Sequence, residues 1–197
     1  VVQDYSSQQT GKIIFEHIND QPKRIWDCCA ASGGKTIMLH DLFPSSSLIV
    51  SDIRESILIN LRKRFQQANI SSYRSFVADL SNDEKKIPLQ SVELVIADLP
   101  CSGSGTWGRN PEQLIYFDPA RIDYYATLQQ RILQTIKSFV ARNGYLVYIT
   151  CSVYKKENES NLEELLKDNS LELVHQQLLI GYPEKADSMF VAIVRKS

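Results

Sequence analysis

The sequence has no surplus of charge of either sign. Its 22 Lys and Arg residues are balanced by 23 Asp and Glu residues, which leaves a net charge of -1. Proteins that hold nucleic acid through bulk positive charge carry a marked excess of Lys and Arg. The composition therefore excludes that class of protein, although nucleic acid can still be a substrate if another part of the molecule grips it.

Membrane-length apolar runs, a secretory signal and metal-binding spacings are also missing. No apolar run approaches the ~20 residues of a membrane span, and the N-terminus lacks the charged and apolar regions of a signal peptide. The four cysteines, at 28, 29, 101 and 151, form no C-x-x-C pair, and the three histidines are scattered. We therefore expect no zinc ribbon, no disulfide framework, no metal and no membrane contact.

The chain has 197 residues and does not begin with Met. This length suits one domain with a sizeable core. We therefore expect a monomeric catalytic domain over residues 1–197, cut from a longer cytoplasmic protein.

Apolar runs alternate with helical periods along the chain. This pattern is typical of an α/β protein with a mostly parallel sheet and helices on both faces. The expected strands are 24–29, 47–51, 73–78, 92–97 and 145–149, and the expected helices are 8–18, one opening at 33–36, 55–68, 121–141 and 157–167. The last apolar runs, 171–174 and 190–194, are expected to form an antiparallel pair.

The turn after the first expected strand, residues 27–36, has the composition of a ligand-binding loop. Small residues let the backbone approach a ligand closely, and the following helix offers free N–H groups. A P-loop is excluded because its first glycine would fall at Cys29, and a dinucleotide fingerprint is excluded because only Gly33 and Gly34 are present. Nothing in the turn is built for several phosphates, so a nucleoside fits best.

Carboxylates end the first four expected strands, at Asp27, Asp52, Asp79 and Asp98. An acidic residue at the position of Asp52 commonly accepts hydrogen bonds from both ribose hydroxyls, and Asp79 is placed to accept from an adenine amino group. Any one of them alone is more simply a cap or turn residue. Because all four fall at one edge of the sheet, we expect a shared site. S-adenosyl-methionine fits this site, since its sulfonium is stabilised by nearby negative charge.

Two cysteines follow the fourth and fifth expected strands, in segments 98–105 and 148–152. A lone cysteine is more often a small buried hydrophobe than a nucleophile, but two at the mouth of one pocket favour chemistry. A reversible disulfide would give the carboxylates no role. A metal site that adds Cys28 and Cys29 is disfavoured because adjacent cysteines chelate one ion poorly. Nucleophilic catalysis on a base accounts for most of these features.

Methylation of cytosine at C5 is a reaction that needs such a thiol. C5 is too weak a nucleophile to attack a methyl sulfonium unaided, but addition of a thiolate to C6 makes it enamine-like. A base then removes the C5 proton and the thiol leaves. Asp98 is the expected donor to N3. A free thiol with a pKa of ~8.5 is mostly protonated at neutral pH, so Lys35 and the helix N-terminus after Cys151 are expected to favour the thiolate.

The motifs closely resemble those of the Sun/RsmB family of RNA cytosine-5 methyltransferases, nearly end to end. The matching segments are Val2–Ser7 (Q-D-x-[AS]-S), Asp27–Lys35 (D-x-C-A-A-P-G-G-K), Asp98–Gly105 with Arg109–Pro111 (D-A-P-C-S-G-x-G, R-[HN]-P), Thr150–Asn158 (T-C-S-x-x-x-x-E-N) and Asp187–Ala192 (D-G-F-F-x-A). The resemblance implies a Rossmann-like fold that depends on S-adenosyl-methionine. It also implies an RNA substrate, rRNA or tRNA, and an RNA-binding domain outside these residues.

The resemblance also assigns roles. Cys151 would be the nucleophile, and Cys101 would assist release of the methylated product. The cofactor would be bound by Cys29, Ala30, Ala31, Ser32, Gly33, Gly34, Lys35, Asp52, Asp79 and Asp98. The chain departs from the family pattern at Ser32, Leu99, Gly108 and Ser188, and none of these departures removes a catalytic group. Gly108 stands where many members carry an arginine, which leaves Arg109 for a phosphate or for a structural role.

Two other functions compete with RNA cytosine-5 methylation. The first is an inactive methyltransferase fold that serves as a scaffold for RNA or the ribosome, and the presence of both cysteines and Asp98 argues against it. The second is methylation of cytosine in DNA. Thr150-Cys151-Ser152 resembles the RNA family and not the DNA enzymes, whose nucleophile follows a proline on the fourth strand.

Overall fold

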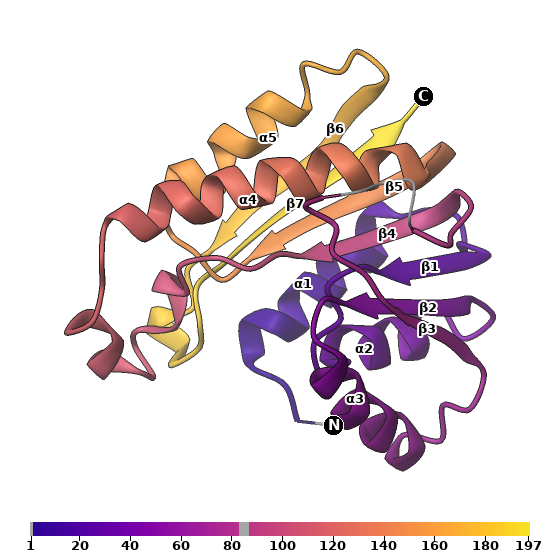
Figure 1. Cartoon of the computed structure of the whole chain (residues 1–197), viewed down its shortest axis with the longest axis horizontal. Coiled ribbons are helices and arrows are strands. Elements are labelled where there is room, and N and C mark those ends of the chain that lie inside the picture. The colour runs from indigo at the N-terminus through magenta and orange to yellow at the C-terminus, as the bar shows by residue number, and fades with distance from the viewer. Residues whose placement is uncertain (1, 83–86) are drawn as a thin grey trace.

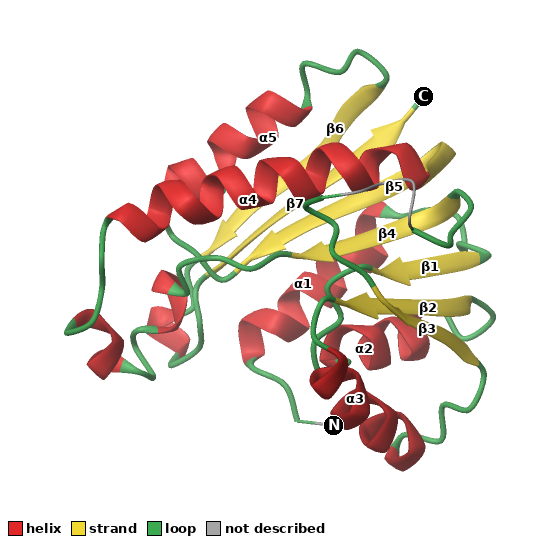
Figure 2. Cartoon of the chain, in the orientation of Figure 1, coloured by secondary structure: helices red, strands yellow, loops and turns green. Residues whose placement is uncertain are grey.

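A single sheet is the framework of the molecule. The computed structural model describes residues 2–82 and 87–197. Within them, seven strands form one sheet in the order β3-β2-β1-β4-β5-β7-β6, and helices cover both of its faces (Figures 1 and 2). The strands are β1 (Arg24–Asp27), β2 (Ser47–Asp52), β3 (Tyr73–Val77), β4 (Val92–Asp98), β5 (Val140–Thr150), β6 (Leu171–Leu179) and β7 (Met189–Lys196). The α-helices are α1 (Tyr5–His17), α2 (Gly34–Leu42), α3 (Glu55–Gln67), α4 (Ala120–Ile136) and α5 (Glu159–Leu165).

Strand β4 illustrates why the apolar runs form a sheet that is buried on both faces. Leu94 and Ile96 belong to the core that α1, α2 and α3 cover, whereas Val95 and Ala97 belong to the core under α4 and α5. All four side chains are fully buried. This two-sided burial is typical of parallel strands linked by crossover helices. The apolar content of the strand therefore follows from its position between two helical layers.

The predicted fold class is confirmed. Strands β3, β2, β1, β4 and β5 are parallel to one another. Strands β6 and β7 form the predicted antiparallel pair, and β7 also runs antiparallel to β5. The pair is longer than the two apolar runs that predicted it, because β6 continues through the polar residues His175, Gln176 and Gln177 to Leu179, and β7 continues to Lys196.

The largest departure from the predicted elements lies before β5. A helix was expected over 121–141, but α4 ends at Ile136, a 3-10 turn follows over Lys137–Phe139, and β5 begins at Val140. Phe139 and Val140 are buried in the core between α4 and the sheet. Tertiary packing therefore overrides the helical preference of these residues.

The first helix begins earlier than predicted. The sequence pattern places its start at residue 8, but α1 begins at Tyr5 because Asp4 caps it. The Asp4 carboxylate accepts a hydrogen bond from the backbone N–H of Ser6 at 2.9 Å, which satisfies a donor that the first turn leaves free. This early start brings the N-terminal segment to the edge of the sheet where the site lies.

The strand order fixes the location of that site. The carboxyl ends of β1, β2, β4 and β5 lie at one edge of the sheet, and successive strands are added in opposite directions on either side of β1. Ligands of open α/β sheets bind at such a switch point, beyond the carboxyl ends of the strands. Within the described residues, no helix has the length and apolar character needed to cross a membrane.

Candidate active site

The loop between β1 and α2 forms one wall of the site. Gly33 adopts a left-handed conformation with φ 80°, and a Cβ there would lie 2.6 Å from the ring of Phe65. Only glycine meets both conditions without strain. The loop is also anchored to β2, because the backbone N–H of Ala30 donates to the carbonyl of Ser51 at 2.9 Å. This contact holds the loop in position against β2.

A cavity of about 340 Å³ opens against this loop. It is lined by Val2, Gln3, Asp4, Ser7, Asp27, Cys29, Ala30, Ala31, Ser32, Gly34, Lys35, Arg64, Asp98, Thr106, Cys151, Asp187 and Met189. Most of the predicted cofactor residues of the loop are among them, together with the catalytic candidates Asp98 and Cys151. The space falls within the range of small-molecule sites and is large enough for a nucleoside-sized ligand.

Three predicted cofactor residues, Gly33, Asp52 and Asp79, do not line the cavity. The carboxylate of Asp52 accepts hydrogen bonds from the backbone N–H of Ala31 and from Arg54 Nε, both at 3.0 Å. Asp79 accepts from the hydroxyl and the backbone N–H of Ser81, and these bonds lower its pKa. Asp52 thus touches the loop, whereas Asp79 closes a local turn.

Asp27 is the carboxyl most strongly affected by its surroundings. Its side chain is buried, one oxygen accepts a hydrogen bond from Thr36 Oγ1 at 2.6 Å, and Oδ1 has no partner among the described residues. Burial raises the pKa of Asp27 from 3.8 to about 7, and the charge of Asp98 adds to the rise. An unpartnered buried oxygen in the lining of a cavity suits a cationic or donor group of a ligand.

Lys35 and Asp98 form an ion pair at the floor of the site. The distance from Lys35 Nζ to Asp98 Oδ2 is 2.7 Å, and only 10% of the lysine side chain is exposed. Burial lowers the pKa of Lys35, but the charges of Asp98, Asp27 and Cys151 outweigh this effect and raise it. The lysine therefore remains charged beside the cavity.

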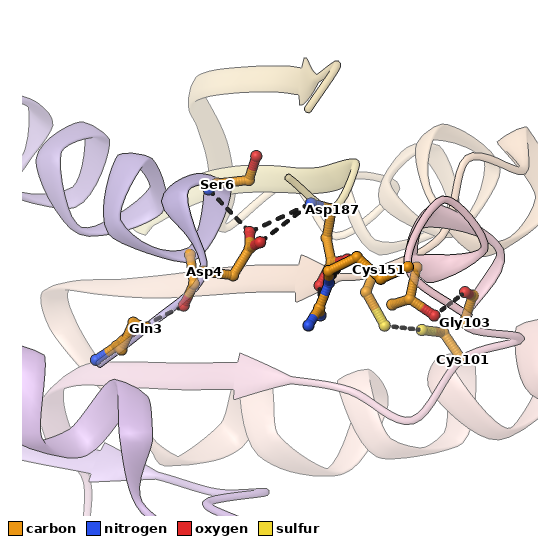
Figure 3. A network of polar contacts seen from close by, with 10 residues as sticks. Gln3, Asp4, Ser6, Cys101, Gly103, Cys151 and Asp187 are labelled. Carbon is orange, nitrogen blue, oxygen red and sulfur yellow. Dashed lines mark hydrogen bonds and ion pairs between the residues drawn. The ribbon is translucent and has the colours of Figure 1, made fainter. Parts of the chain in front are cut away.

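The two predicted cysteines lie next to each other. Cys101 follows β4, Cys151 follows β5, and their Sγ atoms are 3.2 Å apart (Figure 3). The hydrogen bond to Cys151, burial and the charge of Cys151 all raise the pKa of Cys101. These effects favour the protonated form of Cys101, and of the two thiols Cys151 is the one that lines the cavity.

Backbone contacts fix the loop after Cys101 against its neighbours. The N–H of Gly105 donates to the carbonyl of Cys151 at 2.9 Å, and the N–H of Ser188 donates to the carbonyl of Gly105 at 2.8 Å. A Cβ at Gly105 would lie 2.0 Å from the Ser188 carbonyl oxygen. The glycine is thus required by the close approach of three chain segments.

The turn before β7 is tied to two other segments. Arg109 Nε donates to Asp187 Oδ1 at 2.7 Å, and Arg109 Nη2 pairs with Oδ2 of the same carboxylate. Of the two roles considered for Arg109, the structure supports the structural one. Figure 3 shows the Asp4 carboxylate facing the backbone N–H of Asp187. The acceptor is Asp4, the residue that also caps α1.

Aromatic side chains flank the two cysteine loops. The rings of Trp107 and Phe117 are 4.9 Å apart, and those of Phe117 and Tyr154 are stacked at 5.9 Å. Trp107 follows the Cys101 loop and Tyr154 follows Cys151. Next to this cluster, Tyr116 is 79% exposed.

In the sequence, Glu157 and Asn158 are recognisable only as the last two letters of the motif over Thr150–Asn158. Both are completely buried and bind the loop of Cys151. Asp187 was likewise noted only as part of a motif. Burial of these charged residues cannot be recognised from the pattern of one sequence, because part of what binds them lies far away along the chain: Ser102 for Glu157 and Arg109 for Asp187.

Comparison of folds defines the class of protein. The crystal structure of PH0851 matches with a TM-score of 0.89 and 25% identity, covering 100% of this chain and 47% of that one. The crystal structure of NSun6 from Pyrococcus horikoshii with SFG matches with a TM-score of 0.82 and 20% identity, covering 98% of this chain and 52% of that one. The fold is thus that of the Rossmann-like S-adenosyl-methionine-dependent methyltransferases.

The family follows from the sequence comparison. The family model of the 16S rRNA methyltransferase RsmB/F matches residues 14–192, and this chain belongs to that family. The probable ribosomal RNA small subunit methyltransferase B of Synechocystis sp. is 36% identical over 170 residues, which are 85% of this chain and 37% of that protein. The chain therefore spans well under half the length of this relative.

Proposed function

We propose that this chain is the catalytic domain of an RNA (cytosine-5-)-methyltransferase that uses S-adenosyl-methionine and acts on rRNA or tRNA. The observation that carries the proposal is the pair of thiols 3.2 Å apart at a nucleoside-sized cavity. Membership of the RsmB/F family supports the RNA substrate. The two thiols support chemistry at C5 of cytidine, because that carbon must be activated by a nucleophile.

The residues around the cavity suit S-adenosyl-methionine. When bound, this cofactor supplies an electrophilic methyl group. Residues 29–35 would hold it at the wall of the cavity, and the unpartnered Oδ1 of Asp27 would face its positive charge. Asp52 would accept from the ribose hydroxyls after Arg54 moves aside, since 58% of that arginine side chain is exposed. Asp79 would bind the adenine amino group only if its turn with Ser81 opened.

Cys151 is the proposed nucleophile. Its thiolate would add to C6 of cytosine, forming an S–C6 bond and leaving C5 electron-rich. The position of Cys151 in the cavity lining supports this choice, as do the proton held on Cys101 and the charge of Lys35 nearby. Asp98 and Lys35 form an ion pair beside the cavity, so the two would act together: Asp98 would orient the base and direct a proton toward N3, with the positive charge of Lys35 beside it.

Cys101 would serve the release of product. After C5 accepts the methyl group, a base removes the C5 proton and the electron pair re-forms the C5–C6 double bond. The S–C6 bond breaks, and Cys151 leaves as a thiolate. Cys101 would donate a proton to that sulfur across the 3.2 Å contact. The aromatic cluster of Trp107, Phe117 and Tyr154 would support unpaired bases beside the target, because base stacking on aromatic rings is common in RNA recognition.

Labelled methyl transfer tests the proposal. The chain is incubated with total RNA or with DNA and S-adenosyl-methionine labelled in its methyl group, and the digested nucleosides are separated. We expect label in 5-methylcytidine from RNA, and none with Cys151→Ser. The matched control is Cys28→Ala, since Cys28 is a cysteine buried in the core away from the cavity. Equal labelling by the Cys151→Ser variant, or labelling of DNA alone, would contradict the proposal.

A further inference from the structure

A buried carboxylate lies behind the two thiols. Glu157 is located between β5 and α5, in the 3-10 turn Lys155–Glu157, and its side chain is fully buried. An ionisable side chain is rarely buried unless its oxygens are paired. The proposed mechanism assigns no role to Glu157, so we infer its role from its contacts.

Each oxygen of Glu157 is bound by a residue that directly follows a catalytic cysteine. Oε1 accepts a hydrogen bond from the backbone N–H of Ser102 at 2.7 Å. Oε2 accepts from the hydroxyl of Ser102 at 2.6 Å and from the hydroxyl of Ser152 at 2.5 Å. Ser102 follows Cys101, and Ser152 follows Cys151. One carboxylate therefore connects the two loops whose thiols are in contact.

The position of Glu157 is itself fixed. The hydroxyl of Tyr148 donates to the Glu157 carbonyl. The adjacent Asn158 accepts from Thr150 Oγ1 at 2.5 Å and donates to the carbonyl of Ser152 at 2.8 Å. Because Tyr148 and Thr150 lie on β5, these bonds hold the backbone at Glu157 and Asn158 to the sheet.

Charge is distributed unequally around the thiol pair. Lys35 and Arg109 lie on the side of Cys151, since the charge of Cys151 contributes to the raised pKa of each of them. On the other side, the charge of Glu157 contributes to the raised pKa of Cys101, and the charge of Cys101 contributes to the raised pKa of Tyr148. The carboxylates of Asp98 and Asp187 are each neutralised by an ion pair with one of the two cations. Among the described residues, Glu157 forms no such ion pair, so its negative charge lies uncompensated on the side of Cys101.

We propose that Glu157 is a positioning residue that joins the two cysteine loops and keeps Cys101, rather than Cys151, in the protonated form. The inference rests on the proposed function, because it gives a physical reason for the division of roles between the two thiols. A carboxylate beside a thiol disfavours the thiolate by direct repulsion. Hydrogen bonding to Cys151, burial and neighbouring negative charges, that of Glu157 among them, raise the pKa of Cys101 and support the assignment.

Alkylation of the thiols tests this inference without RNA or cofactor. The chain is treated with iodoacetamide across a series of pH values, and the rate at each cysteine is read by peptide mass spectrometry. In the wild-type chain we expect Cys151 to react at lower pH than Cys101. In Glu157→Gln, which keeps the hydrogen-bonding shape and removes the charge, we expect the midpoint of Cys101 to fall by about one pH unit. This fall corresponds to about tenfold more thiolate at a given pH.

Two further variants distinguish the effect of the Glu157 charge from the effect of its hydrogen bonds. Glu163→Gln removes the same charge from an exposed site on α5, and we expect both midpoints to stay unchanged. Ser102→Ala keeps the buried charge but removes one hydroxyl contact, so the alkylation of Cys101 should accelerate several-fold with its midpoint unmoved. Thermal unfolding shows whether the Glu157→Gln chain folds. If it does not fold, the alkylation rate of Cys101 in the Ser102→Ala chain tests the inference in its place.

The inference is overturned by either of two results. One is a wild-type chain in which Cys101 reacts at the same or lower pH than Cys151. The other is a folded Glu157→Gln chain in which the midpoint of Cys101 does not move. Neither result bears on whether RNA is methylated, because no methyl donor is present. Failure of this inference and failure of the proposed function are therefore distinguishable.

Discussion

Replacement of Asp27 by Asn tests the electrostatic state of the cavity. Burial raises the pKa of this carboxyl from 3.8 to about 7, so the folded protein holds a proton that the unfolded chain releases within this window. The unfolded state binds fewer protons there, and stability therefore falls as the pH rises from 3.8 to about 7. Each pH unit between these two pKa values is worth about 1.36 kcal/mol, so the wild-type chain should lose about 4 kcal/mol across the window.

Asn at position 27 has no proton to lose, so this loss should vanish. The amide keeps an acceptor for Thr36 but places a donor where Oδ1 has no partner, which costs about 1–3 kcal/mol at every pH. The variant should thus be less stable than wild type below pH 3.8 and more stable above pH 7. Urea unfolding at several pH values measures the pH at which the two chains are equally stable. The control is Asp20→Asn, which changes an exposed carboxylate. A stability difference that stays constant with pH would refute the reasoning.

Two further predictions concern Gly105 and Lys35. Gly105→Ala should lower the free energy of unfolding by about 3 kcal/mol or more, because the new Cβ would lie 2.0 Å from the Ser188 carbonyl oxygen; thermal unfolding measures this. The control is Gly108→Ala, whose Cβ would meet nothing closer than 3.8 Å and which should change stability by less than about 0.5 kcal/mol. Equal losses of stability in Gly105→Ala and Gly108→Ala would contradict the steric argument. Lys35→Met should slow single-turnover methyl transfer by about 100-fold or more, since it removes the cation beside Asp98; a rate within about threefold of wild type would exclude the role of the ion pair.

Much of the fold and part of the site could be predicted from the sequence. The parallel sheet follows from apolar runs such as that of β4, whose residues must be buried on both faces. The meeting of Cys101 and Cys151 also follows, because the carboxyl ends of neighbouring parallel strands share one edge. The pattern cannot give the 3.2 Å contact itself, which depends on how the two loops pack.

Other features depend on contacts between distant parts of the chain. The helix expected over 121–141 ends at Ile136 because Phe139 and Val140 pack into the core. Glu157 is bonded to Ser102, 55 residues away. Neither contact leaves a periodic signal in the sequence. The predicted roles of Asp52 and Asp79 in cofactor binding stay predictions, since hydrogen bonds within the chain occupy both carboxylates.

A covalent adduct between the protein and RNA would test the proposed chemistry most directly. The Cys101→Ser chain is mixed with total RNA and S-adenosyl-methionine and separated on a denaturing gel, and the attached RNA is sequenced. We predict an adduct that accumulates because release is impaired, and that disappears when Cys151→Ser is added. An adduct that survives the loss of Cys151, or methyl transfer to RNA with no adduct in the Cys101→Ser chain, would contradict the assigned roles of the two thiols.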